Sequence, residues 1–244
     1  MTLIKRGNTW HCHFFVEGER VRRSLGTSDR REAVRRERHL IEKASHGLLS
    51  SKSDFAKLAF DEVLIPLRKP ETGFQIKVHS PSSKLPALKI DEDGLSRTVW
   101  DSLAICETLA ERHPEARLWP EDAAARAEAR SIVAEMHSGF PDLRRVLSMD
   151  IATRHPTPPL DDAVQAQIAR IVSIWQSVLN RYGKSSGFLF GHFTIADAFY
   201  APVATRFETY GVHLPAVAQA YTQRILATPA MREWEESAKA EALP

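Results

Sequence analysis

Two short motifs, about fifteen residues apart, have residue types that could hold a peptide-like ligand. The first is Lys84-Leu85-Pro86, in which the proline opens a predicted strand over Pro86 to Ile90. Because proline has no backbone N–H to donate, it belongs at a sheet edge or a special turn. If the Leu85–Pro86 bond is cis, the backbone of Leu85 is turned outward. The alternative is an ordinary trans proline in a loop.

The second motif is Asp101-Ser102, where a predicted strand over Leu95 to Trp100 runs straight into a helix. The free N–H groups and the dipole at a helix start favour an anion. One interpretation is an ordinary N-cap. The other is a seat for the carboxylate of a ligand, with Asp101 left to meet an ammonium group. The position alone favours the N-cap.

The first part of the chain predicts a strand hairpin followed by a helix. Trp10 to Val16 and Arg20 to Leu25 read as the two strands, and Ser28 or Asp29 can cap the helix. A small, polar junction follows over residues 45–53. Asp61 to Leu67 then reads as a buried strand.

From Pro120 onward the pattern is helical. Ala123 to about Leu147 predicts one long helix with a kink near Pro141. Residues 162–182 form the clearest helix, since apolar residues recur there at steps of three and four. Thr194 and Asp197 have the spacing of a capping box at the start of a later helix. Further helices are predicted over residues 195–209 and 216–227 and from Pro229.

The charge is unevenly divided between these parts. Residues 1–43 hold eleven Lys and Arg against six Asp and Glu, whereas the remaining residues hold 22 against 25. A basic head on a mildly acidic body suggests two parts with different partners. A solvated arginine face on the helix is the other interpretation.

The composition excludes several classes of protein. Of the 244 residues only two are cysteines, Cys12 and Cys106, which argues against a disulfide framework and for a cytoplasmic protein. No apolar run approaches about 20 residues, so we expect no membrane contact. His11, Cys12 and His13 suggest a metal, but two ligands on one strand face do not make a zinc site, and we expect none. Cys106 reads as a buried thiol.

Taken together, the two motifs resemble the glutathione S-transferase family. Residues 78–88, ending in Lys84-Leu85-Pro86-Ala87-Leu88, look like the family's loop into its third strand, and residues 100–105 look like its acidic-Ser pair and helix. Phe190-Gly191-His192-Phe193 and the capping box that follows agree with its helical domain. The resemblance covers roughly residues 55–240.

This resemblance implies roles for particular residues. Leu85, before a cis-proline, would bond the backbone of the glutathione cysteine, and Asp101 and Ser102 would hold the γ-glutamyl end. Lys84 would contact the glycine end. The segment from Ala134 to Phe140 is similar to one bacterial branch of the family. The candidates there for lining the pocket of an electrophilic co-substrate are Met136, His137 and Phe140.

The sequence departs from the family at its start. The family's fold begins with a strand, a turn and a helix that supply a Ser, Tyr or Cys to steady the glutathione thiolate. Here the family-like register begins only at about Phe55. Counting back places that group near Ser45, and although residues 44–53 contain four serines, nothing around them looks like the first strand and turn. The catalytic residue is therefore unknown.

The head resembles something else, the N-terminal arm-binding domain of phage-type tyrosine recombinases. The similar residues are Arg6 to Trp10, Gly18 to Asp29 and Ala33. In those proteins a small sheet and one helix contact DNA. The resemblance implies that the basic residues here serve phosphates, with weak binding in the absence of partners.

We therefore predict an α+β N-terminal part followed by an all-α domain. The parts are a basic ββα head (residues 1–45), an incomplete thioredoxin-like glutathione-binding unit (54–114) and a helical C-terminal domain (120–244). Three functions follow: transfer of glutathione to a small electrophile, DNA binding through the head, or a folded fusion relic without activity. A homodimer is expected by analogy with the family.

Overall fold

The computed structural model describes residues 2–6, 9–16, 19–25, 27–45, 63–67, 69–92, 94–183 and 186–241. The chain divides into two compact units, Met1–Ala59 and Phe60–Pro244. Each is described by itself below. The boundary predicted within the second unit, between residues 114 and 120, stays a prediction.

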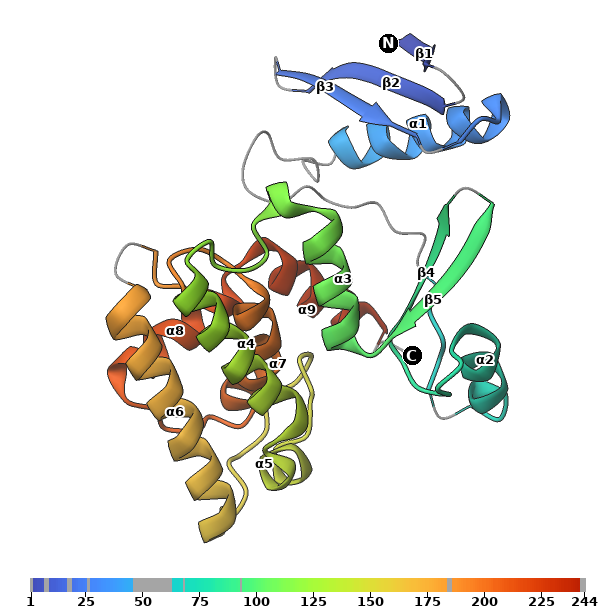
Figure 1. The fold of residues 1–244 in the computed structure, drawn as a ribbon. Helices are drawn as coiled ribbons and strands as arrows, with labels where there is room; N and C mark the ends of the chain where they lie inside the picture. The colour runs from blue at the N-terminus through green and yellow to red at the C-terminus, as the bar shows by residue number, and fades with distance from the viewer. Residues whose placement is uncertain are drawn as a thin grey trace. The chain divides into compact units, whose positions relative to one another are not determined.

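The first unit is a three-stranded antiparallel sheet with one helix against it (Figure 1). Its strands are β1 (Thr2–Arg6), β2 (Thr9–Val16) and β3 (Glu19–Ser24), in that spatial order, and its helix is α1 (Arg30–Ser45). The predicted hairpin and helix are present. Strand β1 was not predicted, because its only apolar residues, Leu3 and Ile4, are adjacent and give no alternation.

Three buried residues and a helix cap can be described in this head. Cys12, Leu25 and Ala33 are buried, with exposed fractions of 1%, 4% and 0%, and join the sheet to the helix. Asp29 caps α1, since its Oδ1 accepts from the backbone N–H of Glu32 at 2.8 Å.

The second unit begins with a small α/β part. It contains α2 (Thr72–His79), β4 (Ala87–Glu92), β5 (Leu95–Trp100) and α3 (Ser102–Arg112). The two strands pair antiparallel, with Ala87 opposite Trp100 and Glu92 opposite Leu95. Gly94 turns the hairpin with a φ of +76°. The hairpin and α3 follow the prediction, whereas α2 was not predicted.

The strand predicted over Asp61 to Leu67 is wrong in the part that the structure describes. Residues 63–67 have no strand conformation, and Val63, Leu64 and Leu67 are 64%, 78% and 66% exposed. Asp61 lies outside the described residues. Among those described, β4 and β5 pair only with each other. A strand needs a neighbour to satisfy its backbone hydrogen bonds, and no described strand lies beside residues 63–67.

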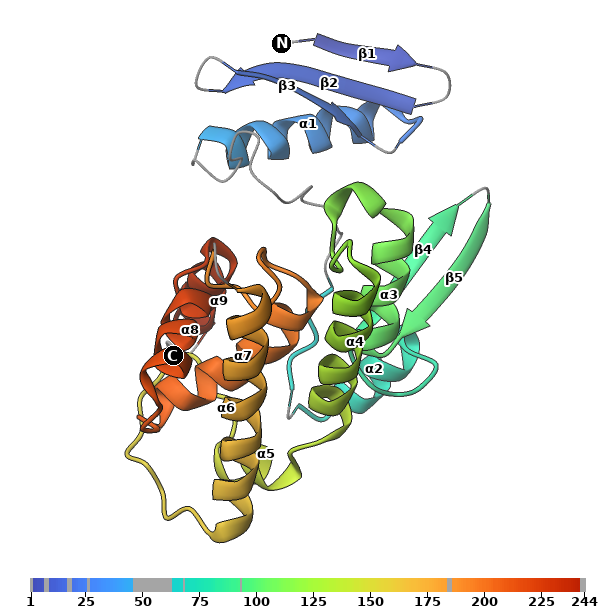
Figure 2. The ribbon, with the colours of Figure 1, turned by 60° about the vertical axis from the view of Figure 1, so that its left-hand side comes forward.

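The rest of the second unit is helical (Figure 2). A short 3₁₀ turn, η1 (Pro114–Ala116), leads into helices α4 (Ala123–Ser138), α5 (Pro141–Val146), α6 (Asp162–Tyr182), α7 (Ile195–Thr209), α8 (Ala216–Leu226) and α9 (Pro229–Glu241). Four of these follow the predicted ranges closely. The long helix predicted from Ala123 to Leu147 is instead two, separated by Gly139 and Phe140. Phe140 has a φ of +59°, so the chain leaves the helix there, and Pro141 opens α5 at a position where its missing N–H costs nothing.

The core of this unit is aromatic. Trp175 of α6 is fully buried, with its ring 5.7 Å from those of Tyr200 and Phe207 and 4.7 Å from that of Tyr221. These contacts join α6, α7 and α8, as the apolar periodicity of residues 162–182 predicts.

The predicted capping box is present at the start of α7. The buried carboxylate of Asp197 accepts from the backbone N–H groups of Thr194 (2.8 Å) and Leu189 (3.0 Å) and from the hydroxyl of Tyr221 (3.1 Å). It therefore ties the loop before α7 and helix α8 to one point. Burial raises the pKa of Asp197, against the effect of these hydrogen bonds.

Candidate functional site

The β4–β5 register brings the two motifs of the sequence to the same end of the hairpin. Ala87, the first residue of β4, lies opposite Trp100, the last residue of β5. Leu85-Pro86 therefore precedes the hairpin at the end where Asp101-Ser102 leaves it. The sequence showed the spacing of these motifs, and the register shows that they are neighbours.

The Leu85–Pro86 peptide bond is cis, which was one of the two alternatives. Lys84 and Leu85 are exposed, Leu85 by 44%, in the loop between α2 and β4. The preceding residue, Ser83, has a φ of +57°. The loop therefore presents Lys84 and Leu85 to solvent at the mouth of the hairpin.

Asp101 is the N-cap of α3, as the plainer interpretation had it. Its Oδ1 accepts from the backbone N–H groups of Leu103 (2.9 Å) and Ala104 (3.4 Å). The predicted seat for an external anion is thus partly filled by the chain's own carboxylate. Asp101 takes this position with a φ of +77°, a conformation uncommon for a residue with a side chain.

The other oxygen of Asp101 contacts a residue from the helical part. Nε2 of His137, near the end of α4, lies 2.9 Å from Oδ2 of Asp101. Partial burial acts to raise the pKa of Asp101. The two backbone hydrogen bonds and His137 outweigh it and hold the pKa below its usual value. Asp101 is therefore a carboxylate that is 45% exposed and already partnered by one imidazole.

Ser102 is the polar group that the protein leaves open at this end of the hairpin. It is the first residue of α3 and is half-buried. Its hydroxyl has no hydrogen-bond partner in the part of the chain that the structure describes. Its hydroxyl can therefore serve a ligand.

A second contact fixes α3 against α4, which run alongside each other in Figure 2. The carboxylate of Glu107 accepts from Nε of Arg130 at 3.1 Å and from Nε1 of Trp119 at 3.1 Å. With the contact between Asp101 and His137, it sets the start of α3 relative to the helical part. Sequence reasoning found neither contact, because no spacing links residues on separate helices.

The three residues expected to line a co-substrate pocket lie in different surroundings. Met136 and Phe140 are buried in the helical core, at 4% and 6% exposed. His137 is half-buried, with its ring edge on Phe199 at 5.8 Å and 77°. Of the three, His137 is the one that contacts the glutathione motifs.

The described residues contain no evident replacement for the missing thiolate-activating group. Ser45 is the last residue of α1, and residues 46–62 lie outside the described part. Burial raises the pKa of the Cys106 thiol to about 11, and Glu107 and Asp101 act in the same direction, so this thiol stays protonated near neutral pH. Among the described residues, no three His, Cys, Asp or Glu side chains gather as a metal would need.

Protein-family models match three segments of the chain. Residues 54–112 match the glutathione S-transferase N-terminal domain, and residues 161–237 match the C-terminal domain of the same family. Residues 54–237 belong to the glutathione S-transferase family. Residues 2–40 match the phage integrase N-terminal domain. Both resemblances expected from the sequence are thereby confirmed.

Curated relatives of the transferase part are maleylacetoacetate isomerases. One from Drosophila melanogaster, named as probable, is 39% identical over 71 residues, which is 29% of this chain and 27% of the relative. Another probable isomerase, from Caenorhabditis elegans, is 30% identical over 37% of this chain and 40% of its own. The maleylacetoacetate isomerase of Rattus norvegicus is 28% identical over 63% of this chain and 70% of its own length. The chain thus spans less than half the length of the first two relatives.

Solved structures share the transferase fold. A glutathione transferase homologue from Burkholderia gl BGR1, with bound glutathione, is 25% identical over 68% of this chain and 79% of its own, with a TM-score of 0.50. Glutathione S-transferase 1-6 from Anopheles dirus species B is 16% identical over 74% of this chain and 84% of its own, with a TM-score of 0.54. The second supports the fold alone. In the described part of the chain, no helix is both long enough and apolar enough to cross a membrane.

Proposed function

We propose that this chain binds glutathione at the end of the β4–β5 hairpin. The observation that carries the proposal is the register that brings Leu85-Pro86 and Asp101-Ser102 to one end, with the Ser102 hydroxyl open and the Asp101 carboxylate exposed. The bound glutathione in the Burkholderia homologue supports this choice of ligand.

Each motif has a role in this proposal. The Ser102 hydroxyl donates to the α-carboxylate of the γ-glutamyl residue, and Oδ2 of Asp101 accepts from its ammonium group. The exposed backbone of Leu85 pairs with the cysteinyl residue, and the Lys84 ammonium attracts the glycyl carboxylate. Because His137 contacts the same oxygen of Asp101, the ligand's ammonium group must share that oxygen or displace the imidazole.

The reaction we propose is transfer of glutathione to a small electrophile, with His137 beside the acceptor, while Met136 and Phe140 lie buried in the helical core. Such a transfer needs a thiolate, and a thiol near its working pH needs a fixed donor or a cation. In this proposal Ser102 and Lys84 serve the two carboxylates of the ligand and His137 contacts Asp101, so none of these groups at the hairpin end is assigned to the thiolate. Binding and turnover are therefore separate questions for this chain.

The names of the curated relatives suggest a class of electrophile. Three of them are maleylacetoacetate isomerases, which points to a small conjugated acid with an electron-poor double bond. Such a compound belongs in the assay beside a generic aryl halide.

Retention on immobilised glutathione, followed by conjugation and isomerisation assays, tests the proposal. We expect the full chain to be retained and to elute with free glutathione. Ser102→Ala should weaken retention about fivefold to tenfold, as loss of one hydrogen bond to a charged group does. Ser131→Ala, on the exposed side of α4, is the matched control, since its hydroxyl bonds the Ala127 carbonyl. Equal elution of the two variants would contradict the proposed site, and retention without turnover would indicate a binding protein.

A second candidate function is DNA binding by the head, which rests on the match of residues 2–40 to the phage integrase N-terminal domain. Arg30, Arg31 and Arg38 are exposed on α1. Glu32 neutralises part of this charge through ion pairs with Arg35 and Arg36. Among the described side chains of α1, few cations remain for phosphates, so we expect affinity for duplex DNA to be weak and to fall between 50 and 200 mM salt. A salt-independent result would contradict this candidate.

We also propose a cytoplasmic homodimer, by analogy with the family. Light scattering on the purified full chain measures the mass directly. A monomer at micromolar concentration would contradict the dimer.

A further inference from the structure

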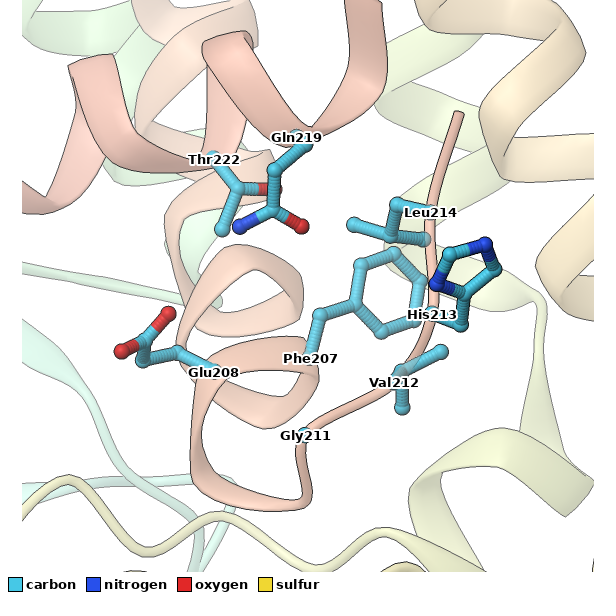
Figure 3. Close-up of a pocket in the computed structure, with 8 residues that line it drawn as sticks. All are labelled: Phe207, Glu208, Gly211, Val212, His213, Leu214, Gln219 and Thr222. Atoms are coloured by element: carbon cyan, nitrogen blue, oxygen red, sulfur yellow. The ribbon is translucent and has the colours of Figure 1, made fainter. Parts of the chain in front are cut away.

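Arg144 of α5 donates only to backbone oxygens, whereas several arginines of the helical part pair with carboxylates. Nε of Arg170 donates to the Glu135 carboxylate at 2.7 Å. Arg154 lies 3.8 Å from the carboxylate of Glu208, at the edge of the cavity that Figure 3 shows between α7 and α8. Among the described residues no carboxylate pairs with Arg144. Its charge is therefore used on the backbone alone.

The oxygens that Arg144 contacts all belong to the end of α4. Its Nε donates to the carbonyl of Gly139 at 3.2 Å, and its Nη2 donates to that of Met136 and lies 3.4 Å from that of His137. The last carbonyls of a helix have no partner within it, and the helix dipole favours a cation there. Phe140, with a φ of +59°, ends α4, and Arg144 reaches back across this break. One side chain thus fixes the last turn of α4, which carries His137.

The imidazole of His137 is held by two further contacts. Its ring edge lies on Phe199, with the ring centres 5.8 Å apart, and its Nε2 is 2.9 Å from Oδ2 of Asp101. An ionised carboxylate can only accept, so Nε2 is the donor in this contact. His137 therefore transmits the position of the α4 end to the start of α3.

Asp101 has one acceptor position left for a ligand. A carboxylate offers about four lone-pair positions. The N–H groups of Leu103 and Ala104 use two at Oδ1, and His137 uses one at Oδ2. The side chain is 45% exposed, which leaves the remaining position accessible. Because His137 restricts the rotation of the carboxylate, it also sets the direction in which this position points.

We propose that Arg144 is a positioning residue for the glutathione site and acts through His137. This inference rests on the proposed function. Arg144 holds the last turn of α4, His137 holds Oδ2 of Asp101, and the ammonium group of the γ-glutamyl residue shares that oxygen with the imidazole. The consequence is selectivity, since a peptide with a free α-amino group binds more tightly than one in which that group is acylated.

The first experiment compares glutathione with N-acetylglutathione, which keeps the thiol and both carboxylates but has no ammonium group. Both are titrated calorimetrically into the full chain at pH 7. We expect the parent to prefer glutathione about tenfold and Arg144→Gln to prefer it only about twofold. Arg126→Gln is the matched control, because Nη1 of Arg126 donates to the carbonyls of Pro120 (2.9 Å) and Glu121 (2.8 Å) before the other end of α4. It should keep the full preference. An unchanged preference in Arg144→Gln would overturn the inference.

The second experiment tests whether Arg144 acts through His137. His137→Phe keeps a ring against Phe199 and removes the donor to Asp101, so it should reduce the preference as Arg144→Gln does. Adding Arg144→Gln to His137→Phe should then reduce it no further. A further loss in the double variant would contradict the route through His137. Arg144→Lys, which keeps the charge but lacks the forked donors, is the second variant if Arg144→Gln does not fold, and it should also reduce the preference.

A measurement without glutathione separates this inference from the proposed function. The carboxyl carbon of Asp101 is followed by NMR as the pH is lowered from 6 to 3. Slight burial raises the pKa of Asp101, and its two backbone hydrogen bonds and His137 together lower it below the ordinary value. His137→Phe and Arg144→Gln should each raise this pKa, and Arg126→Gln should not. If the parent shows this pattern but does not bind glutathione, only the proposed function fails. If Arg144→Gln keeps the pKa that Asp101 has in the parent, the inference fails even where glutathione binds.

Discussion

The helical and the α/β parts of the second unit share one chain but differ in how completely they bury their apolar residues. In the helical part Trp175, Tyr200 and Tyr221 are almost wholly buried. In the α/β part neither α2 nor α3 has a fully buried residue, and Phe74 and Val78 of α2 are 73% and 63% exposed. The helical part buries its apolar residues against one another. The α/β part has the residues of a sheet fold without a strand beside the hairpin among those described.

The two aspartates that cap helices in these parts show the same difference. Asp197 is wholly buried and accepts from three residues, two in the loop before α7 and one on α8, and burial raises its pKa. Asp101 is nearly half exposed, and its pKa is lowered because its hydrogen bonds outweigh its slight burial. The first carboxylate holds a core together. The second stays accessible to a ligand.

The largest effect should come from the centre of the helical part. Trp175→Ala removes a buried ring that contacts three others, so we expect a loss of about 3–5 kcal/mol in the free energy of unfolding. Urea unfolding followed by circular dichroism measures it. A loss below about 1 kcal/mol would mean that the three helices do not share one core.

A smaller loss should follow from removing the buried cap. Asp197→Ala leaves the N–H groups of Leu189 and Thr194 and the Tyr221 hydroxyl without their acceptor, at a cost of about 2–3 kcal/mol. The control is Asp161→Ala, an exposed cap that accepts from Val164 at 2.9 Å and should cost about 1 kcal/mol. Equal losses in the free energy of unfolding would show that burial does not strengthen the capping box of Thr194 and Asp197.

The exposed cap should act through pH. Because the folded pKa of Asp101 lies below its ordinary value of 3.8, its contribution to stability is complete above that value and is lost as pH falls through the folded pKa. The urea midpoint of unfolding should fall as the pH is lowered from 5 to 2, and Asp101→Asn should make this fall slightly smaller. Urea midpoints across that range measure the slope. An unchanged slope would contradict the assigned shift.

The smallest effect is expected in the segment before α2. Leu64 is 78% exposed, so Leu64→Ser should change the free energy of unfolding by less than about 0.5 kcal/mol. Leu143→Ser, at a fully buried position, is the control and should cost several times more. If Leu64→Ser costs about 2 kcal/mol, residues 63–67 are covered in solution, and the contrast between the two parts weakens.

What could be predicted from the sequence follows the same division. Helix α6 was predicted to its ends because its apolar residues repeat over 21 positions, and the capping box was predicted because its partners are three residues apart. The break at Phe140 was placed at Pro141, since a proline suits the first turn of a helix as well as a kink. The eight-residue α2 was missed because its apolar residues lie on no single face.

The sequence predicted which residues form the candidate site, but not how they are arranged in space. The sequence identified Leu85, Pro86, Asp101 and Ser102, because strand and helix signals mark the places where they lie. It could not reveal that His137 contacts Asp101, because that contact joins two helices more than thirty residues apart. It was also misleading about Asp61 to Leu67, since an apolar run predicts a strand whether or not a neighbouring strand exists to receive it.

The two-stranded sheet has a consequence for how copies of this protein meet. Within the described residues each of its strands has one neighbour, so backbone donors and acceptors on the outer edges are open to a strand from another molecule. Lys89, Asp91 and Glu92 on β4 and Arg97 on β5 place charge along this ribbon. A second strand docking there would have to desolvate those charges or match them. As far as the described residues go, these charged side chains therefore oppose the growth of the hairpin into a continuous sheet of several molecules.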